Sequence, residues 1–205
     1  GGIQAIIDVY YNPLASVMVL MVTFVSSLIH IYSVGYMRQE PGYVRYFCYL
    51  NLFVFFMLVI VLADNLVFLF LGWEGVGFTY YALIGFWYRE EKNAVAGRKA
   101  FLLTRIGDVA FVVALGFILM TFGDFALSRL QAGAQTISGE MATLLSLLFL
   151  WAAVGKSAQL PLTVWLPDAM AGPSPVSALI HAATMVTAGV YLLMRVFPLL
   201  AFSPA

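Results

Sequence analysis

Long runs of apolar residues, separated by short polar stretches, repeat along the whole chain. A helix that crosses the hydrocarbon core of a membrane, about 30 Å thick, needs about 20 mostly apolar residues. On this criterion the sequence predicts spans at residues 12–34, 43–63, 65–87, 97–120, 141–172 and 173–197. The pattern therefore predicts an all-α, polytopic transmembrane bundle of about six spans, with residues 1–205 as a single transmembrane region.

The fifth of these stretches is too long for one span. Its 32 residues, 141–172, would form a helix about 48 Å long, and Pro161 and Pro167 interrupt it. We therefore expect a first half-helix that ends near Lys156, an extended break near residues 157–162, and a short second half. Broken backbone at membrane depth is tolerated where it is buried in protein or lines a wet cavity, and transporters place ion sites at such breaks.

The polar stretches between the spans predict the topology, because basic residues favour the inner side of a membrane. If the spans alternate, Arg129 and Arg195 fall on one side and six basic residues fall on the other, which we take as the inside. The six are Arg38, Arg45, Arg89, Lys92, Arg98 and Lys99. Residues 121–140 then form an interfacial loop on the outer side. Because the chain begins without methionine and stops just after a span, we expect it to be a piece of a longer protein.

The composition excludes several classes of protein. Hydrophobic residues make up 63% of the chain and charged residues 10%, against roughly 45–50% and 25% in soluble domains. Ten basic and ten acidic residues leave no basic field that would attract nucleic acid. The one cysteine, Cys48, excludes a disulfide within the chain and a multi-cysteine metal site. Glycines 72, 75 and 77 lie inside an apolar span, so they favour close helix approach rather than a phosphate-binding loop.

Four charged residues lie near the middle of the predicted spans: Glu74, Arg105, Asp108 and Lys156. An ionisable group at this depth costs at least about 2.5–3.5 kcal/mol, and such groups usually mark ion or proton pathways. Arg105 and Asp108 are three apart on one helix, so they share a face and can pair. That pair either anchors helix packing or supports a functional network, and the sequence leaves both readings open.

Glu74 and Lys156 have no partner at helical spacing on their own spans, and we expect them to meet each other. Burial and mutual attraction act in opposite directions on the proton affinities of such a pair, so a small movement could load or release a proton. The alternative is a static ion pair, although burying one seldom stabilises a protein on balance.

His181 lies a third of the way into the last predicted span, with Ser177 and Thr184 on the same helix face. A lone histidine is usually a hydrogen-bonded packing residue. At membrane depth its unperturbed pKa, near 6.5, also suits a proton relay, and the polar face could hold ordered water. We favour the relay for His181, and we interpret His30 as a packing or interface residue.

Several strings are recognisable together: LGWEGVG at residues 71–77, TRIGD at 104–108, VGKSAQLP at 154–161 and WLPDAMAGPSPVSALIHAATMV at 165–186. They resemble the antiporter-like L subunits (chain 5 of the mitochondrial enzyme) of respiratory NADH:quinone oxidoreductase, complex I. The resemblance covers nearly the whole chain. It implies a long all-helical subunit at the far end of the membrane arm, of which this chain holds the first proton half-channel.

The resemblance also implies roles for single residues. Glu74 and Lys156 match the central pair of the channel, His181 matches a histidine that passes protons inward, and Arg105 and Asp108 match the supporting polar network. The chain itself would bind no cofactor, and other subunits would bind NADH, flavin, iron–sulfur clusters and quinone. Its partners would be the lipid bilayer and the other membrane-arm subunits, especially the adjacent antiporter-like subunit.

Two departures from the family pattern matter. Thr163 stands where many relatives have histidine, which puts an extra relay there in doubt. Ala171 stands where mitochondrial chains often have glutamate, which favours the bacterial cytoplasmic membrane over the mitochondrial inner membrane.

We therefore predict a proton-translocating subunit of NADH:quinone oxidoreductase. It would be a translocase component without a redox centre of its own, enzymatic only within its assembly. The alternatives are a subunit of a multi-chain sodium/proton antiporter and a structural scaffold whose buried charges only fix helix packing.

Overall fold

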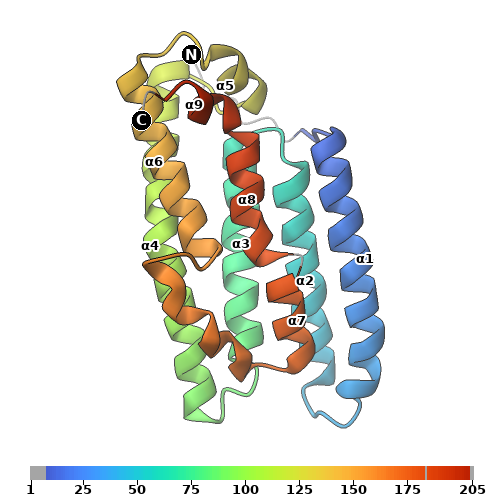
Figure 1. Cartoon of the computed structure of the whole chain (residues 1–205). Helices are drawn as coiled ribbons and strands as arrows, with labels where there is room; N and C mark the ends of the chain where they lie inside the picture. The colour runs from blue at the N-terminus through green and yellow to red at the C-terminus, as the bar shows by residue number, and fades with distance from the viewer. Residues whose placement is uncertain (1–7, 183, 204–205) are drawn as a thin grey trace.

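The computed structural model describes residues 8–182 and 184–203, and this part of the chain folds as a bundle of helices (Figure 1). Six helical stretches among the described residues are long and apolar enough to cross a membrane, which confirms the predicted all-α, polytopic fold. The long helices are α1 (Pro13–Tyr36), α2 (Tyr43–Leu62), α3 (Leu66–Ile84), α4 (Glu91–Phe122), α6 (Gly139–Lys156) and the successive pair α7 (Ser174–Ala182) and α8 (Met185–Arg195). The short elements are α5 (Leu127–Gly133), α9 (Phe197–Ala201) and the 3-10 helices η1 (Leu162–Trp165) and η2 (Pro167–Ala171).

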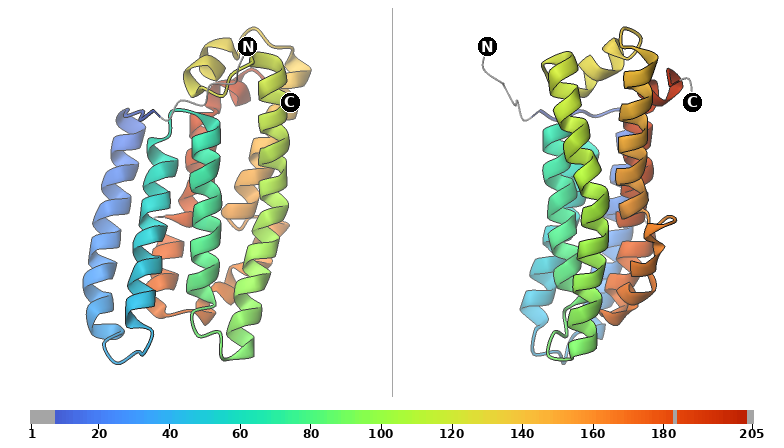
Figure 2. Two further views of the ribbon diagram at one scale, coloured as in Figure 1. Left: turned by 180° about the vertical axis from the view of Figure 1, so that it is seen from behind. Right: turned by 90° about the vertical axis from the view of Figure 1, so that its left-hand side faces the viewer.

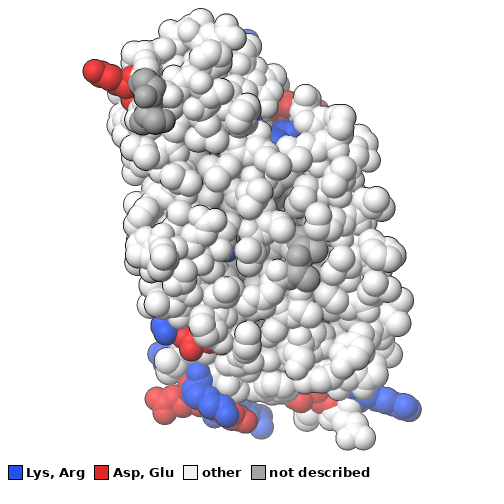
Figure 3. All heavy atoms as spheres, in the orientation of Figure 1, with Lys and Arg blue, Asp and Glu red and all other residues white. Residues whose placement is uncertain are grey.

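The helices form two layers. Seen from behind, α1, α2, α3 and α4 stand side by side in chain order (Figure 2, left), and α6, α7 and α8 cover their other face (Figure 1). The short helices α5 and α9 lie together at one end of the bundle. Charged side chains gather at the opposite end, and the band between the two ends is almost free of them on the face in view (Figure 3). The distribution is that of a bundle whose middle lies in hydrocarbon.

Local signals fix several helix boundaries. The Asn12 side chain accepts a hydrogen bond from the Ala15 amide at 2.8 Å at the start of α1, and Asn65 accepts one from Phe68 at 2.7 Å at the start of α3. Each cap satisfies an amide that the first turn leaves without a helical partner. Gly123 ends α4 in the left-handed region, at φ 68°, a conformation that glycine adopts without a steric penalty.

Helix α4 is longer than predicted. It begins at Glu91 and has 32 residues, so at 1.5 Å per residue it extends about 48 Å and projects beyond the apolar core. The prediction began at residue 97. The helix continues outward from there to Glu91 and includes Lys92, since lysine and glutamate are good helix formers in water.

The break in the fifth stretch is confirmed, but its second half is not an α-helix. Helix α6 ends at Lys156, and the chain continues after a turn as η1 and η2. Prolines 161, 167 and 173 have no amide hydrogen to donate, which prevents a regular α-helix from forming here. The Trp165 indole donates to the Gly155 carbonyl at 3.1 Å, so a buried side chain serves one of the free carbonyls at the end of α6.

The last span, expected to be continuous over 173–197, is divided into α7 and α8. Residue 183 lies outside the described residues, and Thr184 has a non-helical backbone, with φ −124° and ψ −84°. The Thr184 hydroxyl donates to the Leu179 carbonyl. The hydroxyl of Ser157, which follows α6, donates to the Val186 carbonyl at 2.8 Å. The interruptions of two spans therefore lie against each other inside the bundle.

Arg195 is the last residue of α8 and so lies at a span end, as predicted, but its side chain is buried. Only 1% of the residue is exposed. Its Nη2 atom donates to the Ala63 carbonyl at 2.8 Å, and its guanidinium lies over the Tyr10 ring at 4.8 Å. The segment before α1 pairs with the α2–α3 connection through the isolated bridge between Val9 and Ala63. This folding-back covers Arg195, and the linear sequence gives no sign of it.

The 121–140 stretch is partly helical. It contains the end of α4 and all of α5, whose Leu127 and Leu130 are buried against the bundle. That it forms an interfacial loop on the outer side stays a prediction.

Candidate functional site

The four mid-span charges form two ion pairs that link three helices. Arg105 of α4 pairs with Glu74 of α3, and Lys156 at the end of α6 pairs with Asp108 of α4, with 3.5 Å between Nζ and Oδ2. The predicted pairs, Arg105 with Asp108 and Glu74 with Lys156, are both wrong. Residues three apart differ by about 60° around a helix, and α4 lies against both neighbours. Arg105 therefore faces α3, whereas Asp108 faces α6.

A close crossing of α4 and α6 brings Asp108 to Lys156. A Cβ atom on either Gly107 or Gly155 would lie 3.1 Å from the Cα of the other. Small residues at membrane helix crossings allow this approach. Gly77 of α3 gives room to the lysine itself, because a Cβ there would lie 3.1 Å from the Lys156 Nζ atom.

Aromatic side chains of α3 surround the Lys156 ammonium group. Its Nζ atom lies 5.5 Å from the ring centres of both Trp73 and Tyr80, a geometry in which a ring face attracts a cation. The Trp73 indole also donates to Asp108 Oδ1 at 2.6 Å, and the Tyr80 hydroxyl is hydrogen-bonded to Thr104. Sequence reasoning missed both aromatics. Their spacing of seven residues, which puts them on one face of α3, was the available signal.

Several polar atoms of the candidate residues keep free hydrogen-bonding capacity. Within the described part of the chain, Asp108 Oδ2, Lys156 Nζ, Glu74 Oε1 and His181 Nε2 are buried and make no hydrogen bond. Buried polar atoms are normally hydrogen-bonded, and these four belong to titratable residues that the sequence analysis singled out. Donors and acceptors with free capacity are what proton transfer requires.

The two ion pairs differ in burial. Lys156 and Asp108 have 1% and 4% of their side chains exposed, whereas Arg105 and Glu74 have 36% and 21%. Leu102 and Ile106, on the same part of α4 as Arg105, are also exposed. The Glu74–Arg105 pair therefore lies at the edge of an apolar bundle surface, and the Asp108–Lys156 pair lies inside.

His181 lies at the end of α7, one residue before its last. The hydroxyls expected on its face bond backbone carbonyls instead. Ser177 donates to Ala169 at 3.2 Å, and Thr184 donates to Leu179. On the first span, His30 Nδ1 is hydrogen-bonded to the Ser26 carbonyl of its own helix at 2.7 Å.

The observed pairing predicts which substitutions interact. In the full-length protein, Arg105→Met and Glu74→Gln should shift the melting temperature non-additively, because residues in contact couple by about 0.5–3 kcal/mol. Arg105→Met combined with Asp108→Asn should depart less from additivity, because these two residues do not pair and interact only through their charges and through Lys156. Thermal melting of the single and double variants measures both. Coupling of Arg105 to Asp108 alone would contradict the structure.

Two family models match the chain. One, described as "NADH:quinone oxidoreductase/Mrp antiporter, TM", covers residues 63–205. The other, "NADH-Ubiquinone oxidoreductase (complex I), chain 5 N-terminus", covers residues 1–47.

Similar curated proteins carry related names. NADH-quinone oxidoreductase subunit L of Mycobacterium tuberculosis is 50% identical over 204 residues, which is 100% of this chain and 32% of that protein. The subunit L of Escherichia coli is 52% identical over 94% of this chain and 32% of its own length. NADH-ubiquinone oxidoreductase chain 5 of Rhizopus stolonifer is 50% identical over 94% of this chain and 29% of its own length. The chain spans about a third of the length of the curated relatives it matches.

Solved structures give the same fold. The Mrp complex from Dietzia sp. DQ12-45-1b contains a chain with a TM-score of 0.86 and 34% identity over 92% of this chain and 21% of that one. The membrane-bound sulfane sulfur reductase, an archaeal respiratory complex, gives a TM-score of 0.81 over 96% of this chain and 31% of that one, and at 22% identity it supports the fold alone.

Proposed function

The chain belongs to the family of NADH:quinone oxidoreductase and Mrp antiporter membrane subunits, and we propose that it forms the first proton half-channel of a longer complex I subunit. Protons move through Glu74, Lys156 and His181, with Arg105 and Asp108 in support, and quinone reduction elsewhere in the complex supplies the energy. The observation that carries the proposal is a lysine with 1% of its side chain exposed, placed where a span breaks off and paired with one carboxylate.

Lys156 is the group that takes up and releases the proton. A charged lysine at membrane depth is costly, and here the Asp108 carboxylate and the rings of Trp73 and Tyr80 offset that cost. When Asp108 moves away or is protonated, the ammonium group loses its main stabilisation and gives its proton to an acceptor. When the pair closes again, the neutral amine takes up a proton.

The other site residues act on either side of this lysine. Glu74 takes part through Arg105, which shares α4 with Asp108, so a movement of α4 alters both ion pairs together. His181 is the onward relay. Its Nε2 atom is buried without a hydrogen bond, and the bond from Ser157 to Val186 ties the end of α6 to the span that carries the histidine.

The Glu74–Arg105 pair supports the proposed partners. A partly exposed ion pair on an apolar surface is costly in lipid, so another protein element covers it in the assembly. We assign that element to the adjacent antiporter-like subunit or to the rest of the parent subunit. NADH, flavin, iron–sulfur clusters and quinone are held by other subunits, and the complex lies in a bacterial cytoplasmic membrane.

A second candidate function is sodium/proton antiport by a multi-chain complex. The likeness to a chain of the Dietzia Mrp complex, at 34% identity and a TM-score of 0.86, favours it. Both functions use a buried lysine beside a helix break.

Membrane vesicles from the source organism, with and without the full-length parent subunit, separate the two candidates. We expect loss of the subunit to abolish NADH-driven proton uptake and to lower NADH:quinone reductase activity, with no requirement for sodium. Proton uptake is followed with a pH-sensitive dye, and quinone reduction by NADH oxidation. Loss of sodium/proton exchange with intact NADH oxidation would establish the antiporter instead, and no change in either activity would refute both.

A further inference from the structure

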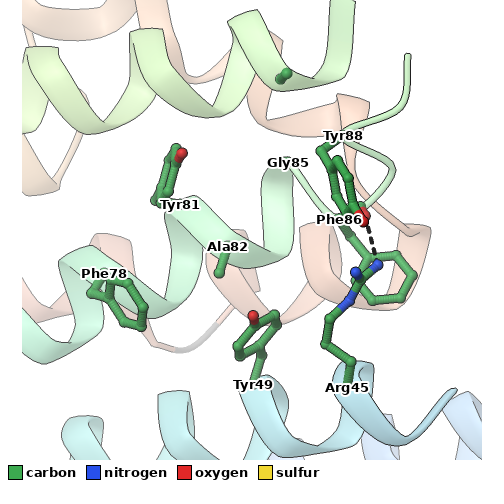
Figure 4. Close-up of a pocket in the computed structure, with 9 residues that line it drawn as sticks. Arg45, Tyr49, Phe78, Tyr81, Ala82, Gly85, Phe86 and Tyr88 are labelled. Carbon is green, nitrogen blue, oxygen red and sulfur yellow. Dashed lines mark hydrogen bonds between the residues drawn. The ribbon is translucent and has the colours of Figure 1, made fainter. Parts of the chain in front are cut away.

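A hollow of 240 Å³ lies between α2 and α3, near the end of the bundle where charged residues gather. Figure 4 shows Tyr49 of α2 and Phe78, Tyr81 and Ala82 of α3 around this space, with Arg45 at the loop end beside Tyr88. Arg45 is the one charged residue among those that line it. The hollow is therefore largely aromatic and has a cation at one end.

Arg45 is held in place by aromatic rings rather than by an acid. Its guanidinium lies 4.7 Å from the centre of the Phe86 ring and 5.0 Å from that of Tyr88, and Nη2 donates to the Phe86 carbonyl at 3.1 Å. Gly42 makes the arrangement possible, because a Cβ there would lie 2.8 Å from the Phe86 ring. The hydrogen bond and charge of Arg45 lower the pKa of the exposed Tyr88 hydroxyl, so the mouth of the hollow favours negative charge.

The acidic residues near Arg45 do not form an ion pair with it. Glu40 and Glu90 line a neighbouring hollow together with Arg45 and Arg89, but Glu90 pairs with Lys92 at 3.2 Å. Across residues 8–182 and 184–203, no acid lies within 4.0 Å of the Arg45 guanidinium. Arg45 can therefore bond an anion from outside the chain.

The hollow opens where hydrocarbon meets the head groups. Phe78 is 51% exposed and Leu71, two turns away on the same face of α3, is 56% exposed, so the hollow opens onto an apolar surface. Arg45 is the third residue of α2, at the end of its span, and Trp87 and Tyr88 lie in the adjacent loop, where interfacial aromatics are common. A ligand here meets a cation at one end and apolar rings at the other.

We propose that this hollow binds an anionic phospholipid, whose phosphate is held by Arg45 while the upper part of one acyl chain lies against Phe78, Tyr81 and Ala82. Basic pockets between transmembrane helices bind such head groups. Its 240 Å³ is less than the roughly 300–1,000 Å³ of pockets for whole small molecules, so it holds part of a lipid. The site is independent of whether the chain moves protons.

Photocrosslinking in the full-length, detergent-purified complex tests the site. The probe is phosphatidylglycerol with a diazirine in its acyl chain, and mass spectrometry locates the crosslinked peptide. We expect crosslinks on the peptide with Phe78, Tyr81 and Ala82. Arg45→Gln should lower their yield at least about tenfold, because charge-assisted hydrogen bonds are the strong ones. The matched control, Arg38→Gln, removes an exposed charge at the same end and should leave the yield unchanged.

Competition distinguishes a lipid from a free anion. Unlabelled phosphatidylglycerol should suppress the crosslink, whereas phosphatidylcholine and inorganic phosphate should not. Competition by inorganic phosphate, equal competition by phosphatidylcholine, or equal yields for the Arg45 and Arg38 variants would overturn the proposal. If Arg45→Gln prevents assembly of the complex, Ala82→Trp is used instead, because its indole fills the apolar part of the hollow while Arg45 is kept. This variant should also lower the crosslink yield at least about tenfold, and an unchanged crosslink yield would overturn the proposal.

Discussion

Replacing Lys156 with methionine is expected to abolish proton pumping by the parent complex. Methionine keeps most of the volume of the lysine side chain but cannot carry a proton. The uptake and release of a proton that we propose for Lys156 is therefore lost. Pumping is measured in native membrane vesicles as NADH-driven acidification, with NADH oxidation recorded in parallel, and native gel electrophoresis shows how much complex is assembled.

The variant also leaves Asp108 buried without its cation. Breaking a buried ion pair from one side costs about 3–5 kcal/mol, which by itself can lower the amount of assembled complex. The double variant Lys156→Met, Asp108→Asn removes the uncompensated charge, so we expect it to restore assembly and not pumping. Normal pumping by the double variant would make the pair a structural anchor and support the scaffold alternative.

Lys99 provides the matched control for this experiment. It also lies near a carboxylate, Asp168, at 2.6 Å, but 46% of its side chain is exposed. Exposed ion pairs contribute about 0–1 kcal/mol. Lys99→Met should therefore leave both assembly and pumping near their wild-type levels.

Replacing Gly107 with valine is expected to prevent assembly of a functional subunit. A Cβ at this position would lie 3.1 Å from the Gly155 Cα and 3.3 Å from two backbone carbonyl oxygens of α6. Backbone atoms cannot rotate away, so α4 and α6 must separate, and overpacking of this kind costs about 1–3 kcal/mol or more. The same separation moves Asp108 away from Lys156, so any complex that still assembles should pump poorly.

Gly116 on the same helix tests whether the effect is specific to the crossing. No atom lies within 4 Å of the position of a Cβ there, so Gly116→Val should assemble and pump normally. Native gel electrophoresis and vesicle acidification compare the two valine variants. Equal defects in the two variants would mean that the effect of Gly107→Val is not specific to the crossing with α6, whereas normal assembly with Gly107→Val would contradict the tight crossing.

The sequence by itself determined the fold class, the places of the spans, the break after Lys156 and the four charges at depth. These features follow from local composition: apolar runs select membrane helices, and prolines deny the backbone its hydrogen bonds. The division between α7 and α8 could not be found in this way, because the residues around 183 include neither proline nor glycine.

The tertiary structure decided which charges pair. Spacing along a helix shows only which side chains can reach each other, whereas the partner depends on how each helix is rotated and how closely its neighbours approach. The glycines at positions 107 and 155 let α4 and α6 approach closely, which brings Asp108 to Lys156. Arg105 pairs instead with Glu74 of α3. The burial of Arg195 likewise depends on a distant segment folding over it. Such contacts join residues far apart in the chain, and local composition carries no information about them.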